Sequence, residues 1–267
     1  MSGVSRLLYD VLFSVFALFY LPFFFLKGKH GEGFTSRFGI VPDAVKERLV
    51  GKKVIWVHAV SVGEVGLAMR LLDALRQKYP EARLVLTTTT VTGHAVARKI
   101  MNPEDTLLYF PVDFRASVAS FVRTVSPRLL ILMETEIWPN VIWELSKRSV
   151  PAVILNGRIS DKALGQYRRV RFFLAPILRR LSLIGAQDPA MRDRFIELGA
   201  EPEKVRLTGN LKFDWAPPAG TGGRAFDAVA QLKKKKDVFL CIAGSTHEGE
   251  EELLFDVYAR IRRAHPN

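Results

Sequence analysis

The chain has 267 residues, of which 48% are hydrophobic and 25% are charged, so it is long enough to fold as at least one large domain. Its single cysteine excludes an intramolecular disulfide framework, and one cysteine with five scattered histidines excludes a structural zinc site. The formal charge of +12 favours a phosphate-rich partner, but the basic residues are scattered and the common nucleic-acid-binding motifs are missing, which argues against nucleic acid.

The N-terminal segment differs in composition from the rest of the chain. Residues 11–26 contain no charged side chain and are rich in phenylalanine. As a helix they would span roughly 24 Å, which is less than the hydrocarbon core of about 30 Å. Residues 1–27 are therefore predicted to be a membrane anchor that either spans the bilayer marginally or lies in one leaflet, with a buried core helix as the alternative. More basic residues follow this segment than precede it, which places the remainder of the chain on the cytoplasmic side.

Residues 28–51 are rich in glycine and in basic residues. This composition predicts a surface loop that contacts lipid headgroups or serves as a plain connector.

From Lys53 onward, apolar runs alternate with helical patterns. Seven runs are predicted to be strands, at residues 54–59, 83–89, 106–110, 128–133, 151–156, 182–187 and 204–208. Helical spacing follows the first strand at residues 68–75 and recurs at residues 115–125, 140–148, 162–180 and 189–198. This alternation predicts an α/β fold with a doubly wound, mostly parallel, Rossmann-like sheet that has helices on both faces.

A stretch rich in proline and glycine interrupts the alternation after residue 214. Residues 215–236 are predicted to be an interdomain linker. Residues 237–243, which include Cys241, are predicted to form a buried strand, and residues 250–263 a helix. Because one βα unit cannot bury a sheet, residues 237–267 are expected to be the truncated start of a second α/β domain.

The first predicted strand ends in the turn Ser61-Val62-Gly63-Glu64, and a helix follows. Ligands of open parallel sheets bind outside the carboxyl ends of the strands, so Glu64 is expected in such a crevice. Gly63 would let a ligand approach the backbone closely, and the helix N-terminus favours an anionic group. The alternative is that Glu64 only stabilises the first turn of its own helix.

Three further strands are followed by polar residues, in Glu134-Thr135-Glu136-Ile137-Trp138-Pro139-Asn140, Asn156-Gly157-Arg158-Ile159-Ser160 and Thr208-Gly209-Asn210-Leu211-Lys212-Phe213-Asp214. Parallel strands place these ends at one edge, so two carboxylates, an arginine and a lysine are expected to line one crevice. This set suits a general base with electrostatic partners, although Glu136 and Lys212 could each be simply solvated. The threonines at 87–90 could bind a polar ligand or could merely favour β-structure.

Several common enzyme motifs are missing. The sequence has no Gly-x-Gly-x-x-Gly fingerprint after a first strand, no Gly-Lys-Ser/Thr phosphate loop and no nucleophile elbow. A dinucleotide oxidoreductase, a phosphate-loop NTPase and an α/β-hydrolase are therefore disfavoured.

Together with the aromatic N-terminus, the motifs at residues 58–64, 134–140, 156–160, 208–214 and 244–248 resemble the Kdo transferases of lipopolysaccharide synthesis. Kdo is 3-deoxy-D-manno-oct-2-ulosonic acid. The resemblance implies a GT-B glycosyltransferase, in which two Rossmann-like domains face a cleft. By length, this chain corresponds to an N-terminal acceptor-binding domain at residues 28–214 and the start of a C-terminal donor-binding domain, with the main CMP contacts beyond residue 267.

The resemblance also implies a reaction and roles for individual residues. Kdo would pass from CMP-Kdo to the lipid A precursor, lipid IVA, at the cytoplasmic face of the cell inner membrane, without a metal or organic cofactor. Glu64 resembles the catalytic base, and Glu134 and Lys212 resemble the residues that stabilise the transition state. Further substrate contacts are expected from Ser61, Gly63, Glu136, Asn140, Asn156, Arg158, Ser245 and Thr246.

This assignment is consistent with inverting chemistry. A carboxylate can deprotonate a sugar hydroxyl while the anomeric carbon is attacked from the face opposite the leaving group. The leaving group, CMP, is already an anion and needs no strong acid. Two competing predictions are an acceptor-binding module without catalytic activity and a basic nucleic-acid-binding protein.

Overall fold

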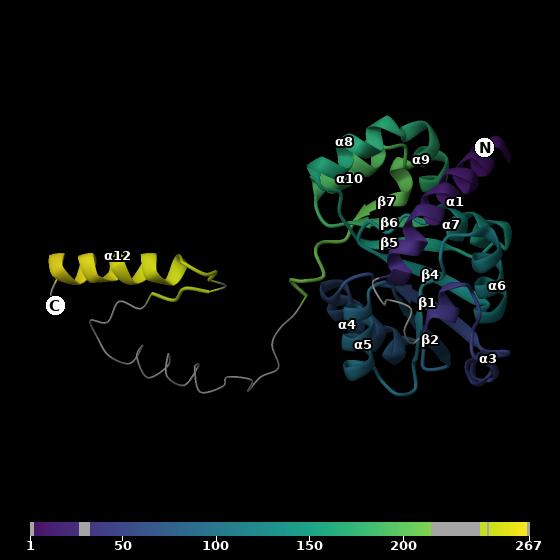
Figure 1. The fold of residues 1–267 in the computed structure, drawn as a ribbon, viewed down its shortest axis with the longest axis horizontal. Coiled ribbons are helices and arrows are strands. Elements are labelled where there is room, and N and C mark those ends of the chain that lie inside the picture. The colour runs from purple at the N-terminus through teal and green to yellow at the C-terminus, as the bar shows by residue number, and fades with distance from the viewer. Residues whose placement is uncertain (1–2, 27–32, 215–240, 245, 266–267) are drawn as a thin grey trace. The chain divides into compact units, whose positions relative to one another are not determined.

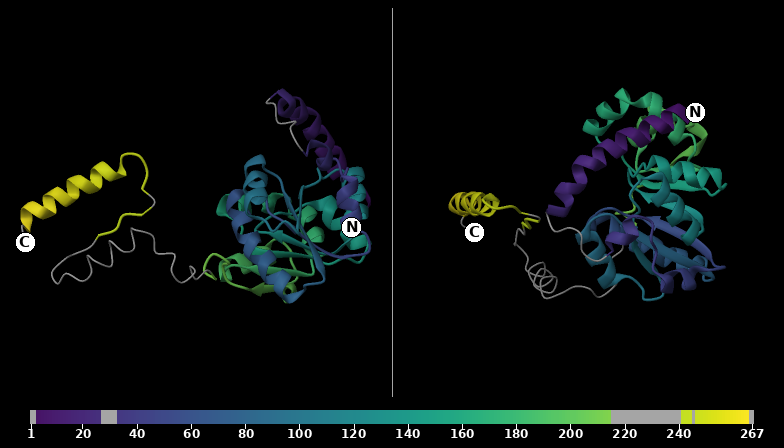
Figure 2. Two further views of the ribbon diagram at one scale, coloured as in Figure 1. Left: turned by 90° about the horizontal axis from the view of Figure 1, so that it is seen from below. Right: turned by 45° about the vertical axis from the view of Figure 1, so that its right-hand side comes forward.

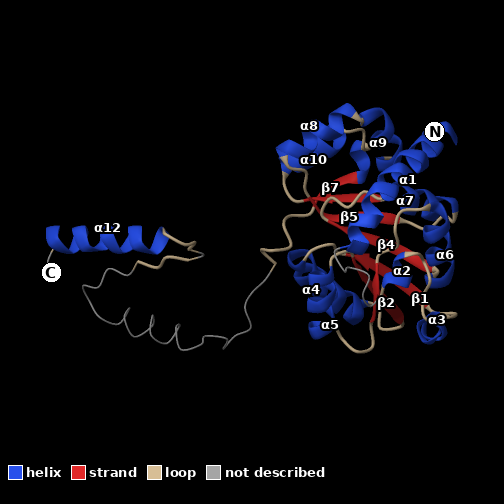
Figure 3. Cartoon of the chain, viewed as in Figure 1, coloured by secondary structure: helices blue, strands red, loops and turns tan. Residues whose placement is uncertain are grey.

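The computed structural model describes residues 3–26, 33–214, 241–244 and 246–265. The chain divides into two compact units, Met1–Trp215 and Ala216–Asn267. The first unit contains the sheet and the helices that cover it (Figures 1 and 3).

The first unit is built on a seven-stranded sheet in the order β3-β2-β1-β4-β5-β6-β7, and every neighbouring pair is parallel. Each of the seven strands predicted between residues 54 and 208 is present, and its ends lie within one residue of the prediction. The strands are β1 (Lys53–His58), β2 (Ala82–Thr88), β3 (Thr106–Tyr109), β4 (Pro127–Met133), β5 (Ala152–Gly157), β6 (Leu183–Ala186) and β7 (Val205–Leu207). The Rossmann-like parallel sheet is thus confirmed.

Helices cover both faces of the sheet, because successive residues of the central strands alternate between two apolar cores. Val54 and Trp56 belong to the core beneath one set of helices, whereas Ile55 and Val57 belong to the other. The second core is closed by α4 (Val62–Lys78) and α5 (Val91–Ile100). The first core is closed by α3 (Asp43–Leu49), α6 (Arg115–Val125), α7 (Pro139–Lys147), α8 (Asp161–Arg169), α9 (Arg171–Leu178) and α10 (Pro189–Glu197).

Two predictions about these connections need correction. The helix predicted at residues 162–180 is divided, because Val170 has φ −110° and ψ 18° and ends α8 before α9 begins. Residues 33–51 are not simply a loop: they contain α2 (Phe34–Arg37) and α3, whose Leu49 is buried in the first core. Residues 28–32 lie outside the described residues.

The strand order creates a topological switch point between β1 and β4. From β1 the chain proceeds through α4 to β2 and through α5 to β3, on one side of the sheet centre. It then crosses back to β4, which pairs with the other side of β1, and continues to β7. The loops that follow β1 and β4 therefore diverge to opposite faces, and the carboxyl ends of these two strands are where ligands of such sheets bind.

The N-terminal helix α1 (Gly3–Leu26) lies across the outside of this unit (Figure 2). Its inner face packs on the domain: the Tyr9 ring lies 5.5 Å from Phe173 and 6.0 Å from Trp143, and Phe13 lies 5.2 Å from Phe114. None of the helices in the described ranges is both long enough and apolar enough to cross a membrane.

In the second unit, α12 (Glu250–Ala264) confirms the predicted helix. The strand predicted at residues 237–243 is not observed where the structure describes it, since residues 241–243 have no strand pairing, and residues 237–240 lie outside the described residues. Cys241 is exposed, contrary to the prediction of a buried core residue, because in the part of this unit that the structure describes no strand pairs with residues 241–243. The predicted linker, 215–236, also lies outside the described residues.

Candidate active site

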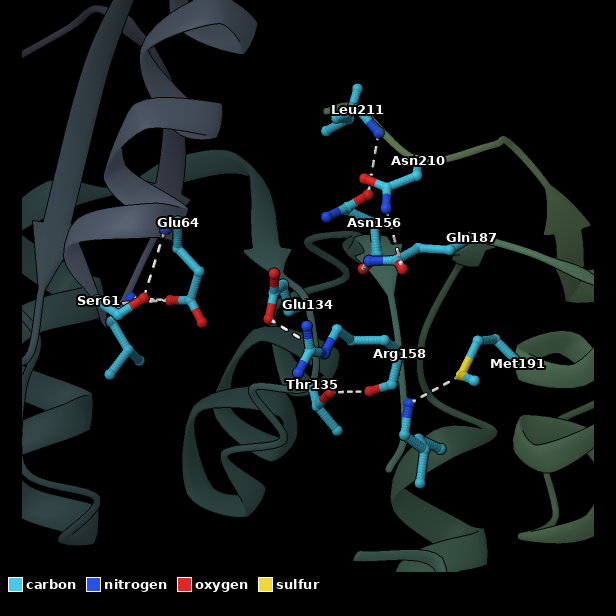
Figure 4. Close-up of polar contacts among 12 residues, drawn as sticks. Ser61, Glu64, Glu134, Thr135, Asn156, Arg158, Gln187, Met191, Asn210 and Leu211 are labelled. Carbon is cyan, nitrogen blue, oxygen red and sulfur yellow. Dashed lines mark hydrogen bonds and ion pairs between the residues drawn. The ribbon is translucent and has the colours of Figure 1, made fainter. Parts of the chain in front are cut away.

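Glu64 lies at the start of α4, where its carboxylate closes a capping box. Ser61 is the N-cap residue: its hydroxyl accepts a bond from the Glu64 backbone N–H at 3.4 Å. In return, Oε2 of Glu64 accepts bonds from the backbone N–H groups of Val60 and of Ser61, the latter at 3.1 Å (Figure 4). The helix-capping role that the sequence left as an alternative is therefore present in the structure.

Capping occupies only one oxygen of this carboxylate. Within the described residues, both hydrogen bonds of the carboxylate go to Oε2, which leaves Oε1 with the freedom to accept a proton from a ligand. Burial raises the pKa of Glu64, and the N–H groups of Ser61 and Val60 oppose that rise. A capped carboxylate with one unengaged oxygen and a raised pKa can serve as a general base in a fixed orientation.

Glu134 follows β4 in a strained backbone conformation. Its φ of +56° is left-handed, which is unusual for a glutamate and costs of order 1–2 kcal/mol. Its backbone N–H donates to the Leu155 carbonyl at 2.9 Å, and its Oε2 lies 3.6 Å from Nε of Arg158. The adjacent Thr135 hydroxyl donates to the Arg158 carbonyl, so the ends of β4 and β5 are tied together (Figure 4).

Glu136 is a third carboxylate at this edge of the sheet, near Glu64 and Glu134. Its Oε2 accepts a bond from Nε1 of Trp138 at 2.9 Å. Burial, together with the negative charge of Glu64, raises the pKa of Glu136 to about 7. Glu134 and Arg158 both act electrostatically on Glu64, and Glu64 and Glu134 both act on Glu136. The predicted charged residues that follow β1, β4 and β5 therefore lie close together.

Replacing Glu136 with glutamine should stabilise the protein at pH 8 but not at pH 4. Below the ordinary pKa of a glutamate, both the folded and the unfolded chain carry the proton, so the wild type pays no penalty. As pH rises from about 4.5 to about 7, the unfolded state releases its proton while the folded state still holds it, so stability falls over this range and levels off above it. Glutamine keeps the acceptor for Trp138 without that cost, and we expect a gain of about 1–3 kcal/mol at pH 8 in urea unfolding. A surface substitution, Glu203→Gln, serves as the control, and an equal effect of Glu136→Gln at both pH values would contradict the prediction.

Asn156 is the next-to-last residue of β5, and its side chain reaches the loop that carries Lys212. Asn156 is 1% exposed and has φ +58°, a left-handed conformation that asparagine tolerates well. Its Oδ1 accepts a bond from the Leu211 backbone N–H at 3.1 Å, whereas its Nδ2 is buried without a partner among the described residues. Figure 4 shows this carboxamide between the loop and the side on which Glu64 and Glu134 lie.

Lys212 is exposed on the loop after β7, at the same edge of the sheet. Its backbone N–H donates to Oδ1 of Asn210 at 3.0 Å, and Nζ makes no ion pair or hydrogen bond within the described residues. The ammonium group is consequently available to a ligand.

Asn140 does not have the exposed position expected of a substrate ligand. It is fully buried: its Nδ2 donates to Oδ1 of Asp10 at 2.8 Å and to the Asp113 carbonyl at 2.7 Å, and its Oδ1 accepts from Arg6 at 3.1 Å. Its side chain is used to join α1 to α7. The carboxylate of Asp113 also accepts from Tyr9 of α1 at 2.7 Å.

Three other residues predicted to contact the substrate are Gly63, Ser245 and Thr246. Gly63 is exposed, and a Cβ built on it would come no nearer than 4.0 Å to the Ser61 hydroxyl. Thr246 belongs to the second unit, where its hydroxyl donates to Glu251 at 2.8 Å, and Ser245 lies outside the described residues.

The threonines after β2 have structural roles. Thr87 contacts the Trp56 indole at 2.8 Å and the His58 ring at 3.0 Å, and Thr88 contacts the His94 ring at 2.9 Å. Thr90 caps α5 by accepting from Gly93. These contacts favour the simpler interpretation, that the threonines stabilise the fold.

Sequence reasoning missed two residues of this site, Trp138 and Gln187. Gln187 directly follows β6, so the rule that selects polar residues at strand ends would also have identified it. Trp138 carries no such signal, because only the fold shows that its indole N–H points to Glu136.

A family model described as 3-deoxy-D-manno-octulosonic-acid transferase (kdotransferase) matches residues 32–215. The chain is 35% identical over 215 residues to the 3-deoxy-D-manno-octulosonic acid transferase of Haemophilus influenzae, which covers 80% of this chain and 49% of that protein. It is 31% identical over 240 residues to the protein of the same description from Chlamydophila psittaci, which covers 90% of this chain and 54% of the relative.

The chain therefore spans about half the length of these curated relatives. Among solved structures, UDP-GlcNAc 2-epimerase from Neisseria meningitidis bound to UDP-GlcNAc aligns with a TM-score of 0.45 at 10% identity, over 80% of this chain and 54% of that one.

Proposed function

The chain belongs to the 3-deoxy-D-manno-octulosonic-acid transferase family, and from that premise we propose that its first unit is the acceptor-binding domain of a Kdo transferase. The donor is CMP-Kdo and the acceptor is the lipid A precursor. Residues 28–214 form the acceptor domain, residues 215–236 the linker, and residues 237–267 the start of the donor domain.

One observation carries this proposal: Glu64, in the helix after β1, and Glu134, directly after β4, are about 70 residues apart in the chain but lie at the same topological switch point of the sheet, where Glu134 acts electrostatically on Glu64. This edge of the sheet carries a carboxylate that has one unengaged oxygen, the cation of Arg158 and, on the loop after β7, the exposed cation of Lys212. A negatively charged substrate requires such cations. If Glu64 only capped its helix, the fold would require neither the strained backbone of Glu134 nor charged residues around Glu64.

Glu64 acts as the general base in this proposal. Oε1 removes the proton from the acceptor hydroxyl, whose oxygen then forms a bond to the anomeric carbon of Kdo as the bond to the CMP phosphate breaks on the opposite face. Glu134 stabilises positive charge that develops on the sugar ring, and Lys212 stabilises negative charge on the leaving group. Arg158 and Glu136 contact the substrate at the edge of the crevice.

The N-terminal helix provides the contact with the membrane in the same proposal. Six apolar residues of α1 are exposed on one face, at helical spacing: Leu7, Leu8, Val11, Leu12, Val15 and Leu18. The opposite face packs on the domain through Tyr9 and Phe13. This arrangement favours a helix that lies in one leaflet, at the cytoplasmic face of the inner membrane, near a lipid-linked acceptor. Failure of the chain to float with vesicles of anionic phospholipid would overturn this assignment.

Transfer of Kdo is the direct test. CMP-Kdo and lipid IVA are incubated with the 267-residue chain, alone and extended with the part of the H. influenzae relative that this chain does not match. Transfer by the extended form supports the proposal, and transfer by neither form contradicts it. Binding of lipid IVA without transfer by either form would instead support the second candidate, an acceptor-binding module.

A nucleic-acid-binding protein is the remaining competitor, because the net charge is +12. Titration with a labelled oligonucleotide at physiological salt separates the two functions. Submicromolar binding would count against the glycosyltransferase assignment, since non-specific binding at this salt is expected at about 1–100 μM.

Replacing Gly63 with alanine should weaken acceptor binding about 10-fold without destabilising the fold. A Cβ at this position would approach only the Ser61 hydroxyl, at 4.0 Å, and alanine in a helix is favoured over glycine by about 0.5–1 kcal/mol, so the unfolding temperature should stay constant or rise. The loss would arise because the methyl group occupies space that the acceptor requires. Lipid IVA binding is measured by titration, with Gly165→Ala in α8 as the control, since a Cβ there meets nothing within 4 Å. Unchanged affinity in Gly63→Ala would contradict close approach of the acceptor to this turn.

A further inference from the structure

Three carboxamide side chains connect the ends of β5, β6 and β7. Nε2 of Gln187, the residue that follows β6, donates to the Asn156 carbonyl at 3.0 Å. Oε1 of Gln187 accepts from Nδ2 of Asn210 at 3.4 Å, in the loop after β7. Figure 4 shows the side chain of Gln187 beside Asn156 and Asn210.

Two of these carboxamides also hold the backbone N–H groups of Leu211 and Lys212. Oδ1 of Asn156 accepts from the Leu211 N–H at 3.1 Å, and Oδ1 of Asn210 accepts from the Lys212 N–H at 3.0 Å. Residues 210–212 are thus fixed to β5 and β6 by side chains rather than by strand pairing.

Apart from the hydrogen bonds of Thr208 to the Ala186 carbonyl, few contacts among the described residues hold this loop. β7 is a three-residue strand at the edge of the sheet, and Gly209 follows it with φ +77°. Phe213 is 86% exposed, and Leu211 provides the apolar contact of the loop with the core beneath α4 and α5. Because Nζ of Lys212 has no protein partner among the described residues, its position depends on the backbone that carries it.

We propose that Gln187 is a positioning residue, which holds the 208–212 loop so that the ammonium of Lys212 faces the crevice. The inference rests on the proposed function, since it assumes that Lys212 acts in the transfer reaction. Neutral amides suit this task because they order the loop without adding charge beside Glu64, Glu134 and Arg158. Gln187 itself need not touch the substrate.

The test compares Gln187→Met, which keeps the length of the side chain and removes its hydrogen bonds, with Gln77→Met on the exposed surface of α4. Amide hydrogen exchange is measured first, on the 267-residue chain, and needs no activity. We expect the Leu211 and Lys212 amides to exchange at least 10-fold faster in Gln187→Met, while amides of β1 and β4 remain as protected as in the wild type and in Gln77→Met. Unchanged exchange at Leu211 and Lys212 would overturn the inference and leave the proposed function intact.

Kinetics of the extended form provide the second measurement. Gln187→Met should lower kcat about 10-fold and change the KM for lipid IVA less than 2-fold, because the transition state rather than acceptor binding depends on Lys212. Adding Lys212→Ala to Gln187→Met should cause no greater loss than Lys212→Ala alone. Independent, multiplicative losses would overturn the positioning role. If Lys212→Ala alone leaves transfer unchanged, the role proposed for Lys212 fails, and the positioning role fails with it.

Discussion

Replacing Glu64 with glutamine is expected to lower Kdo transfer by about 1,000-fold while the unfolding temperature stays within about 1 °C of the wild type. Glutamine has the same shape and retains a carbonyl oxygen that can accept bonds from the N–H groups of Val60 and Ser61, so the capping box survives. It cannot take up the proton of the acceptor hydroxyl. Activity is measured with the extended form and stability with the 267-residue chain.

Glu64→Ala provides the matched comparison, because it removes both the base and the cap. It should be as inactive as Glu64→Gln but less stable by about 1 kcal/mol. These two substitutions separate the two roles that one side chain has in the structure. If Glu64→Gln retained more than a tenth of the wild-type activity, the carboxylate would have only its capping role, and the proposed base would have to be sought elsewhere.

Replacing Lys212 with alanine is expected to reduce kcat by about 100- to 1,000-fold with no measurable change in stability. The side chain is exposed and has no ion pair or hydrogen bond within the described residues, so its loss should not affect folding. In the transition state, however, its ammonium would stabilise the negative charge that develops on the leaving phosphate. A solvated surface lysine would show no loss of kcat.

Lys99→Ala is the control for the charge, since Lys99 is exposed at the end of α5, which carries none of the proposed catalytic residues. We expect this variant to transfer Kdo at the wild-type rate. A Lys212→Ala variant that behaved like Lys99→Ala would remove Lys212 from the mechanism, and a loss confined to KM would assign Lys212 to binding rather than to catalysis.

The candidate site was only partly predictable from the sequence. The strand-end rule identified Glu64, Glu134, Arg158 and the loop of Lys212, because parallel strands bring distant residues to one edge. The rule could not distinguish Asn140, which lies in an equally polar stretch but is buried beneath α1 with its carboxamide fully used. Nor could it show that Glu64 both caps its helix and leaves one oxygen unengaged, because that depends on the rotamer within the turn.

The structure also changed the interpretation of two segments outside the site. The sequence predicted one helix at residues 162–180, since apolar spacing continues through Val170, but the backbone leaves the helical region there. The glycine-rich stretch before β1 was expected to be a loop, yet Val41 and Leu49 in it join the main core. Local composition gave no indication of this, because burial is decided by the neighbouring helix α6 rather than by the segment itself.

By itself, the sequence determined the strands, most of the helices and the parallel arrangement, because these depend on the period of apolar residues and on the spacing between runs. Only the tertiary structure decided the rest. It placed β4 beside β1, so that Glu64 and Glu134, which are some 70 residues apart in the chain, lie at the same edge of the sheet. It also buried Glu136 deeply enough to raise its pKa to about 7. Strand order, burial and side-chain orientation are properties of contacts between distant segments, and no local pattern in the chain encodes them directly.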